Sequence, residues 1–157
     1  MKKLISSIFL LFVSCCYLNR NISVKNKLYF ERIENFSNQP NLTFVLKEKL
    51  EEIFIKYPKF EIVSSKEASD YIIDLKIIKF TRTPLFFSTK DSNNIVGGKY
   101  EVEIDFVLKE KNGIIINKRL KESFSTTIYK EYNEDKILSK ICERISKKLY
   151  FEIIKME

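Results

Sequence analysis

Two adjacent cysteines, Cys15 and Cys16, are the residues whose type and position predict chemistry most directly. They follow a leader that begins with two lysines and continues as an apolar run, Leu4–Val13, which is too short for a membrane span of about 20 residues. In bacterial lipoprotein signals, a cysteine placed here receives a lipid on its thiol and becomes the new N-terminus. We expect lipidation of Cys15, because the preceding Ser14 is small. Cys16 remains the alternative, with Cys15 in the small-residue position.

Other catalytic and metal chemistry has little support in the sequence. The chain contains no histidine, and its third cysteine, Cys142, lies far from the other two. Histidine and cysteine are the usual zinc ligands, and histidine is the commonest general base. With three glycines in the whole chain, no glycine-rich phosphate loop is recognisable. We therefore expect no enzyme activity, no metal and no cofactor besides the N-terminal lipid, and we interpret Cys142 as a small core residue.

The same leader divides the chain into three parts. We expect residues 1–14 to be a signal peptide that is removed, residues 15–26 to be the lipidated N-terminus and a tether, and residues 27–157 to be one domain. Neither candidate cysteine is followed by the aspartate that retains many Gram-negative lipoproteins in the inner membrane. The expected location is therefore the periplasmic face of the outer membrane. The formal charge of +7 is spread along the chain, so a solvated surface explains it and no nucleic-acid partner is expected.

Hydrophobic periodicity predicts a small set of helices and strands. Strands are expected at Lys27–Ile33, Phe60–Val63, Asp70–Thr81, Lys99–Lys109 and Ile114–Tyr129, and helices from Leu42 to Tyr57 and after the cap residue Asn133. Glu34–Asn41 carries turn residues. Thr83–Gly98 is expected to be a loop of about sixteen residues, a length that is often functional, and its Phe86 and Phe87 would enter the core or face lipid or another protein.

The long strand has two partly apolar faces. Tyr71, Ile73, Leu75 and Ile77 alternate on one face, and Ile72, Asp74, Lys76, Ile78 and Phe80 alternate on the other. This pattern indicates a strand inside the sheet or an outer face that meets a partner.

The last two strands are expected to form a hairpin whose register follows from its side-chain pairs. A three-residue loop with Gly113 in the left-handed conformation pairs Leu108 with Ile116, Ile104 with Leu120, Tyr100 with Phe124, Asp105 with Arg119 and Glu103 with Lys121. Apolar and opposite-charge pairs each contribute roughly 0.2–1 kcal/mol, so this register is favoured over the one from a two-residue Asn-Gly loop. Lys118 and Glu122 then lie on the apolar face, which we attribute to fraying at the sheet edge.

These elements predict an α+β fold. Its two amphipathic helices would pack on one face of a mixed, about four-stranded sheet, as a two-layer sandwich in the order β-α-β-β-β-α.

The pattern as a whole resembles the LptE family of outer-membrane lipoproteins. The resemblance is carried by the following segments: Cys15-Cys16-Tyr17, Leu28–Phe36, Pro40–Phe54, Phe60–Val63, Ala68–Ile72, Tyr100–Leu108 and the final helix. It implies a non-catalytic domain that sits inside the LptD barrel as a plug, assists its folding and binds lipopolysaccharide.

A lipopolysaccharide ligand would present the phosphates of lipid A, for which charge-assisted donors are suited. The candidate residues are Arg82, Arg119 and Lys121, although the last two also have expected cross-strand partners. Related two-layer lipoproteins leave other functions open: an activator of a cell-wall synthase, a secretion-channel component, or a ligand-binding lipoprotein that acts alone.

Overall fold

The computed structural model describes residues 26–87, 95–126 and 133–156, so the predicted signal peptide and both candidate lipidation sites lie outside the described residues. The described part of the chain forms the strands β1 (Asn26–Phe30), β2 (Glu34–Asn35), β3 (Phe60–Ile62), β4 (Tyr71–Phe87), β5 (Ile95–Glu110) and β6 (Gly113–Ser125), and the helices α2 (Leu42–Lys56) and α3 (Glu134–Ile154).

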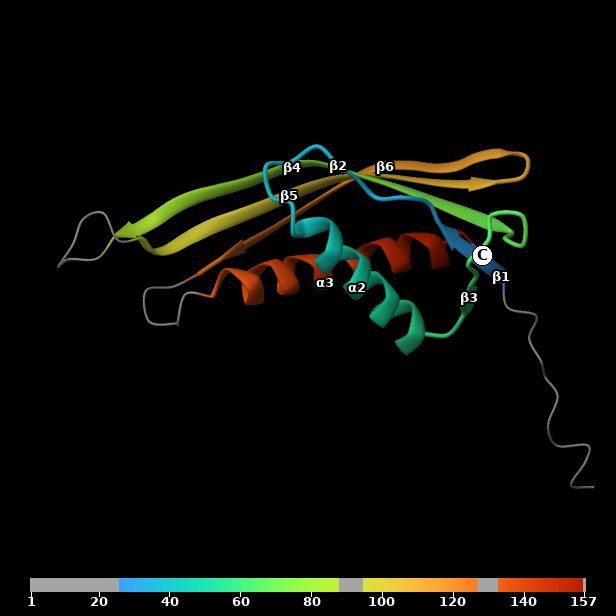
Figure 1. Cartoon of the computed structure of the whole chain (residues 1–157), viewed down its shortest axis with the longest axis horizontal. Helices are drawn as coiled ribbons and strands as arrows, with labels where there is room; N and C mark the ends of the chain where they lie inside the picture. The colour runs from blue at the N-terminus through green and yellow to red at the C-terminus, as the bar shows by residue number, and fades with distance from the viewer. Residues whose placement is uncertain (1–25, 88–94, 127–132, 157) are drawn as a thin grey trace, which may run out of the picture.

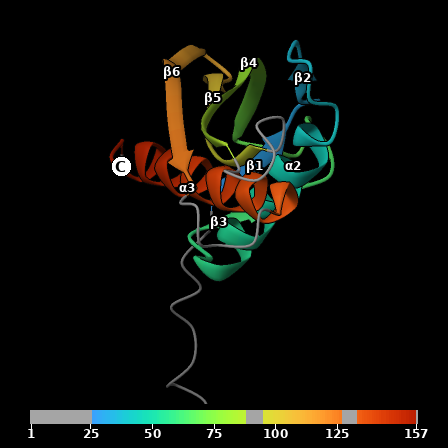
Figure 2. The ribbon, with the colours of Figure 1, turned by 90° about the vertical axis from the view of Figure 1, so that its left-hand side faces the viewer.

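The strands form one mixed sheet, and the helices cover one of its faces. In the described residues the sheet has six strands in the order β3-β1-β4-β5-β6, with β2 beside β4. β1 runs parallel to β3 and β4, whereas β4, β5 and β6 form an antiparallel meander. α2 and α3 lie on the same side of this sheet (Figures 1 and 2). The α+β fold is therefore confirmed.

The sheet is larger than the expected four strands. Glu34–Asn35, which we expected in a turn, pairs with Lys76 and Ile77 of β4. Phe60–Ile62 forms a strand of its own beside β1. The strand expected at Phe60–Val63 is therefore confirmed as β3, whereas β2 was missed because two residues are too few to show a period of two.

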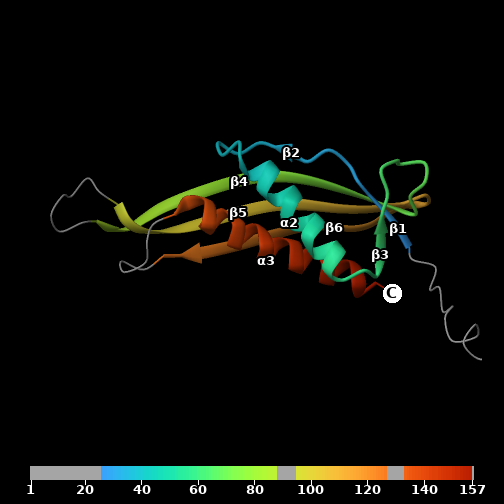
Figure 3. The same cartoon turned by 60° about the horizontal axis from the view of Figure 1, so that its bottom comes forward.

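The core lies between the helix layer and the sheet. α2 crosses α3 obliquely on this side of the sheet (Figure 3). The fully buried side chains that the helices contribute include Leu46, Leu50 and Phe54 from α2 and Ile141, Ile145 and Leu149 from α3. The sequence-derived cap is confirmed, since the Asn133 side chain accepts a hydrogen bond from the backbone N–H of Lys136 at 3.0 Å. Cys142 is fully buried in α3, as a small core residue.

The predicted hairpin register is confirmed, but the turn differs. Leu108 lies opposite Ile116, Tyr100 opposite Phe124, Asp105 opposite Arg119 and Glu103 opposite Lys121. At the tip, Glu110 pairs with Gly113 around a turn of Lys111 and Asn112. β6 has one extra residue between its partner for Lys109 and its partner for Leu108, and this residue restores the predicted register. Gly113 has a positive φ, as expected, at +142°.

β4 contains a bulge that corrects the predicted faces of the long strand. Ile77 pairs with Ile104 and Lys79 pairs with Glu103, so Ile78 is an extra residue. A one-residue insertion reverses the side-chain alternation after it. Phe80, expected on the outer face, therefore lies on the helix-covered face opposite Val102 and packs against the core.

The expected loop Thr83–Gly98 is largely strand. β4 continues to Phe87 and β5 begins at Ile95, with Pro84 paired to Gly98. A β-carbon on Gly98 would lie 3.0 Å from the carbonyl oxygen of Thr83, so this glycine permits close approach of the strands. We had interpreted the proline and glycines as loop signals. The side-chain positions of Phe86 and Phe87 lie outside the described part of the structure.

Candidate functional site

The sheet face that α2 and α3 leave uncovered carries a connected set of charges. We call this surface the charged sheet face and define it by the following residues: Asp74, Lys76, Glu101, Glu103, Asp105, Lys109, Arg119 and Lys121. They come from β4, β5 and β6. The register places them on one face of the sheet, and the other face carries the buried row of β5, which is Tyr100, Val102, Ile104, Phe106 and Leu108. Because side chains alternate along a strand, the same strands that build the core present these charges.

Arg119 and Asp105 form a two-bonded pair on the charged sheet face. Arg119 donates from Nε to Asp105 Oδ1 at 2.6 Å and from Nη2 to Asp105 Oδ2 at 2.9 Å. These hydrogen bonds hold the pKa of the Asp105 carboxyl below its ordinary value. The fork of the guanidinium matches the carboxylate, so the Arg119 side chain has a defined orientation.

Lys121 lies beside Arg119 on β6 and contacts two carboxylates. Its Nζ lies 2.6 Å from Glu101 Oε1 and 3.0 Å from Glu103 Oε1. The hydrogen bonds to Glu101 and Glu103 raise the pKa of Lys121. A phosphate that binds Arg119 or Lys121 would have to compete with these carboxylates.

The charged sheet face continues toward β1 and β2 through two further lysines. Lys109 Nζ lies 3.2 Å from Asp74 Oδ2 and 3.4 Å from Glu31 Oε2, and Lys76 Nζ lies 3.1 Å from Glu34 Oε2. The hydrogen bond to Asp74 raises the pKa of Lys109. Sequence reasoning missed these pairs, because they join strands that are distant in the sequence and β2 had no strand signal.

Arg82 lies on the other face of the sheet, so the three lipopolysaccharide candidates do not form one site. The bulge at Ile78 places Arg82 opposite Tyr100, with its guanidinium carbon 6.0 Å from the ring centre. Arg82 Nη1 lies 3.8 Å from Glu134 Oε2 in the first turn of α3. Arg119 and Lys121 both lie on the charged sheet face, whereas Arg82 takes part in the contact between β4 and α3.

The two misfit residues of β6 have partners in α3. Lys118 forms an ion pair with Glu152, and Glu122 forms one with Lys148. Both residues lie on the helix-covered face, as the register predicted, but they extend across the sheet edge to the polar side of α3. Specific charge pairing, rather than fraying, therefore explains their position.

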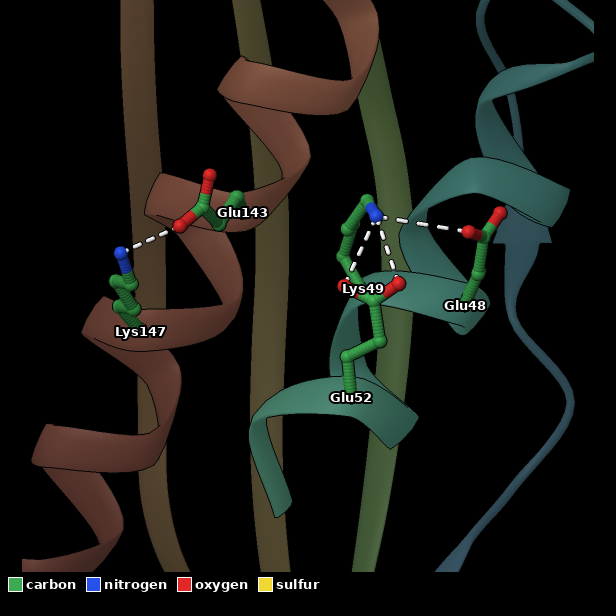
Figure 4. A network of polar contacts seen from close by, with 5 residues as sticks. All are labelled: Glu48, Lys49, Glu52, Glu143 and Lys147. Atoms are coloured by element: carbon green, nitrogen blue, oxygen red, sulfur yellow. Dashed lines mark hydrogen bonds and ion pairs between the residues drawn. The ribbon is translucent and has the colours of Figure 1, made fainter. Parts of the chain in front are cut away.

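The helix surface contains further pairs, but each helix forms its own. In α2, Lys49 Nζ lies 2.8 Å from Glu52 Oε1 and 3.5 Å from Glu48 Oε1, and in α3 Glu143 binds Lys147 at 2.5 Å (Figure 4). Neighbouring side chains one turn apart commonly pair in this way. These contacts therefore indicate a solvated helix surface.

A groove runs between the β1–β2 segment and α2. Its volume is about 830 Å³, within the range of small-ligand sites. The apolar part of the lining includes Phe30, Ile33 and Leu50, and the charged part includes Arg32 and Lys47. The rim residue Phe36 is 65% exposed. Sequence analysis did not find this groove, because its residues come from a segment we interpreted as strand and turn.

Catalytic groups are sparse in the described residues. These residues contain no cluster of three or more histidine, cysteine, aspartate or glutamate side chains that would hold a metal ion. Burial raises the pKa of the Cys142 thiol to about 12, which keeps it protonated and unreactive at neutral pH. Among the described helices, none combines the length and the hydropathy needed to cross a bilayer.

Comparisons with known proteins identify the fold but no family. The sequence matches no family model and no curated protein. The structure is similar to the hypothetical protein CT253 from Chlamydia trachomatis, with a TM-score of 0.60 and 9% identity over 83% of this chain and 96% of that chain.

Two solved lipoproteins also share the fold. Lipoprotein GNA1162 from Neisseria meningitidis has a TM-score of 0.52 and 6% identity over 80% of this chain and 98% of that chain. A minor lipoprotein from Acinetobacter baumannii has a TM-score of 0.51 and 13% identity over 83% and 93%. At such identities the likeness concerns the fold alone.

Proposed function

We propose that this protein is a non-catalytic lipoprotein of the outer membrane that binds inside a barrel of the LptD type and assists the insertion of lipopolysaccharide. The lipoprotein part is supported by the leader before Cys15 and by two lipoproteins with the same fold. The barrel and lipopolysaccharide are supported by the LptE-like sequence pattern.

The observation that carries the proposal is the charged sheet face. The interior of a large membrane barrel is polar, so a domain that occupies it needs a polar, charge-balanced surface. On the charged sheet face, each of Arg119, Lys121 and Lys109 contacts at least one carboxylate within 3.4 Å. Such a surface suits the polar, water-filled lumen of a barrel better than it suits contact with an apolar protein surface.

Purification of the protein from membranes tests the proposed partner. A tagged full-length chain is expected to retain an outer-membrane barrel. The double variant R119E/K121E is expected to retain less of it, because it replaces two positive charges by negative ones on the surface proposed to face the lumen. The matched variant K47E/K147E changes the charge equally on α2 and α3 and is expected to behave like the unmodified chain. Recovery of a cell-wall synthase or a secretion-channel component instead of a barrel would replace this function with the alternative one.

Lipopolysaccharide binding is tested separately with the purified protein. If Arg119 and Lys121 contact lipid A phosphates, R119E/K121E is expected to weaken binding by roughly 1.5–3 kcal/mol per lost contact. Added salt is expected to weaken binding by the unmodified chain more than binding by this variant, because only the unmodified chain has these contacts to screen. R82E tests the candidate on the opposite face by the same measurement. Unchanged affinity in all folded variants would remove these three residues from the proposal.

The lipid anchor is tested by mass spectrometry of the N-terminal peptide of the mature protein. We expect a lipid on Cys15. An unmodified N-terminus in a protein released without detergent would exclude the anchor.

A further inference from the structure

The end of the domain at which β1 begins exposes a group of apolar side chains. Asn26, the first described residue, pairs with Phe60 of β3. Phe60 lines a groove of about 220 Å³ together with Tyr71, Glu110, Ile115, Ile153 and Met156. We call this the tether-end groove. The β5–β6 hairpin tip and the C-terminal end of α3 lie at this same end of the molecule (Figures 1 and 3).

The side chains around the tether-end groove are unusually exposed for their type. Ile114 and Ile115 at the hairpin tip are 63% and 42% exposed, and Met156 is 38% exposed. Ile115 of β6 and Met156, in the turn after α3, line the groove from two different parts of the chain. A cluster of exposed apolar residues, unlike a single one, marks a surface that contacts a partner or a membrane.

Basic residues accompany this apolar group. Lys111 is exposed in the turn of the hairpin, next to Glu110 of the groove lining. Lys155, beside Met156, is also exposed and lies 3.0 Å from Glu152 Oε1, so a headgroup phosphate would compete with this carboxylate for Lys155. Apolar side chains flanked by lysines match the interface of an anionic membrane, where apolar groups enter the acyl boundary and lysines contact phosphate headgroups.

The length of the chain before β1 determines which end of the domain lies near the membrane. From Cys15 to Asn26 the chain can span at most about 40 Å. β4 has 17 residues, so it spans about 55 Å. The chain before β1 therefore allows the tether-end groove to touch the bilayer, and it is too short for the domain to stand on the other end of β4.

We infer that the tether-end groove and the hairpin tip dock on the surface of the anionic bilayer to which the protein is anchored. This inference rests on the proposed lipid anchor. Ile114, Ile115 and Met156 enter the acyl boundary, and Lys111 and Lys155 contact headgroup phosphates. In the anchored protein that is not bound to a barrel, this contact fixes the orientation of the domain, so that the ends of β4 and β5 far from β1 point away from the membrane surface.

The chain has no tryptophan, so a single introduced tryptophan reports the position of one side chain. We suggest I115W, with I114W as a second variant in case I115W disturbs the groove. The matched control is F44W, because Phe44 is 72% exposed on α2. The mature lipidated protein is reconstituted in vesicles of phosphatidylethanolamine and phosphatidylglycerol that carry bromine on the acyl chains.

Two measurements separate the anchor from the docking surface. The lipid anchor is sufficient for the protein to float with the vesicles, so absence of flotation would overturn the proposed anchor. In floating protein, the emission of I115W or I114W is expected to shift to shorter wavelength and to lose intensity through bromine quenching, whereas F44W keeps the emission that it has in detergent-free buffer. Adding K111E is expected to reduce the quenching.

Equal quenching in I114W, I115W and F44W, with the protein anchored, would overturn the docking surface. A shift to shorter wavelength without bromine quenching would also overturn it, because the tryptophan would then be covered by a second copy of the chain.

Discussion

The two faces of the sheet are built by the same strands but have opposite chemistry. On β5, Phe106 is fully buried beneath the helices, and its neighbours Asp105 and Val107 point to the uncovered face. The buried face holds the layers together through removal of apolar surface from water. The charged sheet face contributes little by comparison, since exposed ion pairs are worth about 0–1 kcal/mol each. Its charges can therefore serve binding without much loss of stability.

The largest expected effect comes from the buried face. F106A is expected to lower the free energy of unfolding by about 3–5 kcal/mol, because it removes a ring from a closed core. V107A, one residue along the same strand, is expected to cost about 1 kcal/mol or less, because Val107 is only partly buried on the outer face. Urea unfolding of both variants gives the comparison. Similar losses would show that the charged sheet face is covered by something in the folded state.

The second effect tests whether water is excluded from the buried part of the helix layer around Cys142. In the folded protein the Cys142 thiol has a pKa of about 12, against an ordinary value of 9.0. Between these values the unfolded chain loses a proton that the folded chain keeps, so stability falls as pH rises above about 9, by up to about 1.4 kcal/mol per pH unit. Below pH 9 the thiol has no effect.

The comparison variant for this pH series is C142A. Between pH 9 and 11, the free energy of unfolding of C142A is expected to fall less steeply than that of the unmodified chain. The two proteins have all other titrating groups in common, so the difference between their curves reports the Cys142 thiol. Parallel curves, or rapid labelling of Cys142 by iodoacetamide in the folded protein, would show that water reaches this layer.

The third effect concerns the turn that sets the register of both faces. Gly113 has a φ of +142°, and no atom lies within 4 Å of where a β-carbon would be. G113A is therefore expected to cost about 1–2 kcal/mol through backbone strain alone. N112A in the same turn is the control and is expected to be nearly neutral, because no non-glycine residue of the described chain has a positive φ. A loss in N112A as large as that in G113A would argue against strain as the cause.

The smallest effect lies on the charged sheet face itself. R119A is expected to change stability by about 1 kcal/mol or less, yet to raise the pKa of Asp105 toward its ordinary value, since Arg119 is the main cause of the lowering. Carboxyl chemical shifts followed through an acid titration give this pKa. K47A on α2 is the control. An unchanged Asp105 titration in R119A would show that the pair is not formed in solution.

Sequence reasoning succeeded where one residue pattern allowed one arrangement. The β5–β6 register was predictable because Leu108, Ile104 and Tyr100 had apolar partners in a single register, and Asp105 then met Arg119. It failed at Ile78, because an inserted residue leaves no mark in a strand whose both faces are partly apolar. It also failed at Gly98, where a glycine that permits close strand approach resembles a loop residue.

The candidate site was predictable only in part. Arg119 and Lys121 lie two apart on one strand, so their shared face followed from the alternation of a strand. Arg82, the third candidate, lies after the bulge and therefore on the other face, beside Tyr100 and Glu134. The two grooves depend on contacts between segments that are distant in the sequence, and periodicity does not report such contacts.

The parallel contact between β1 and β4 has a consequence for the order in which the chain folds. The backbone N–H of Lys27 donates to the Asp70 carboxylate across 43 residues, whereas Arg119 meets Asp105 across 14. Closing the longer loop costs about 1 kcal/mol more in chain entropy, and distant pairings form slowly. We expect the β5–β6 hairpin to nucleate early and β1 to join late. β1, the first of the described strands to be synthesised, thus completes the sheet only after β4 has formed its place.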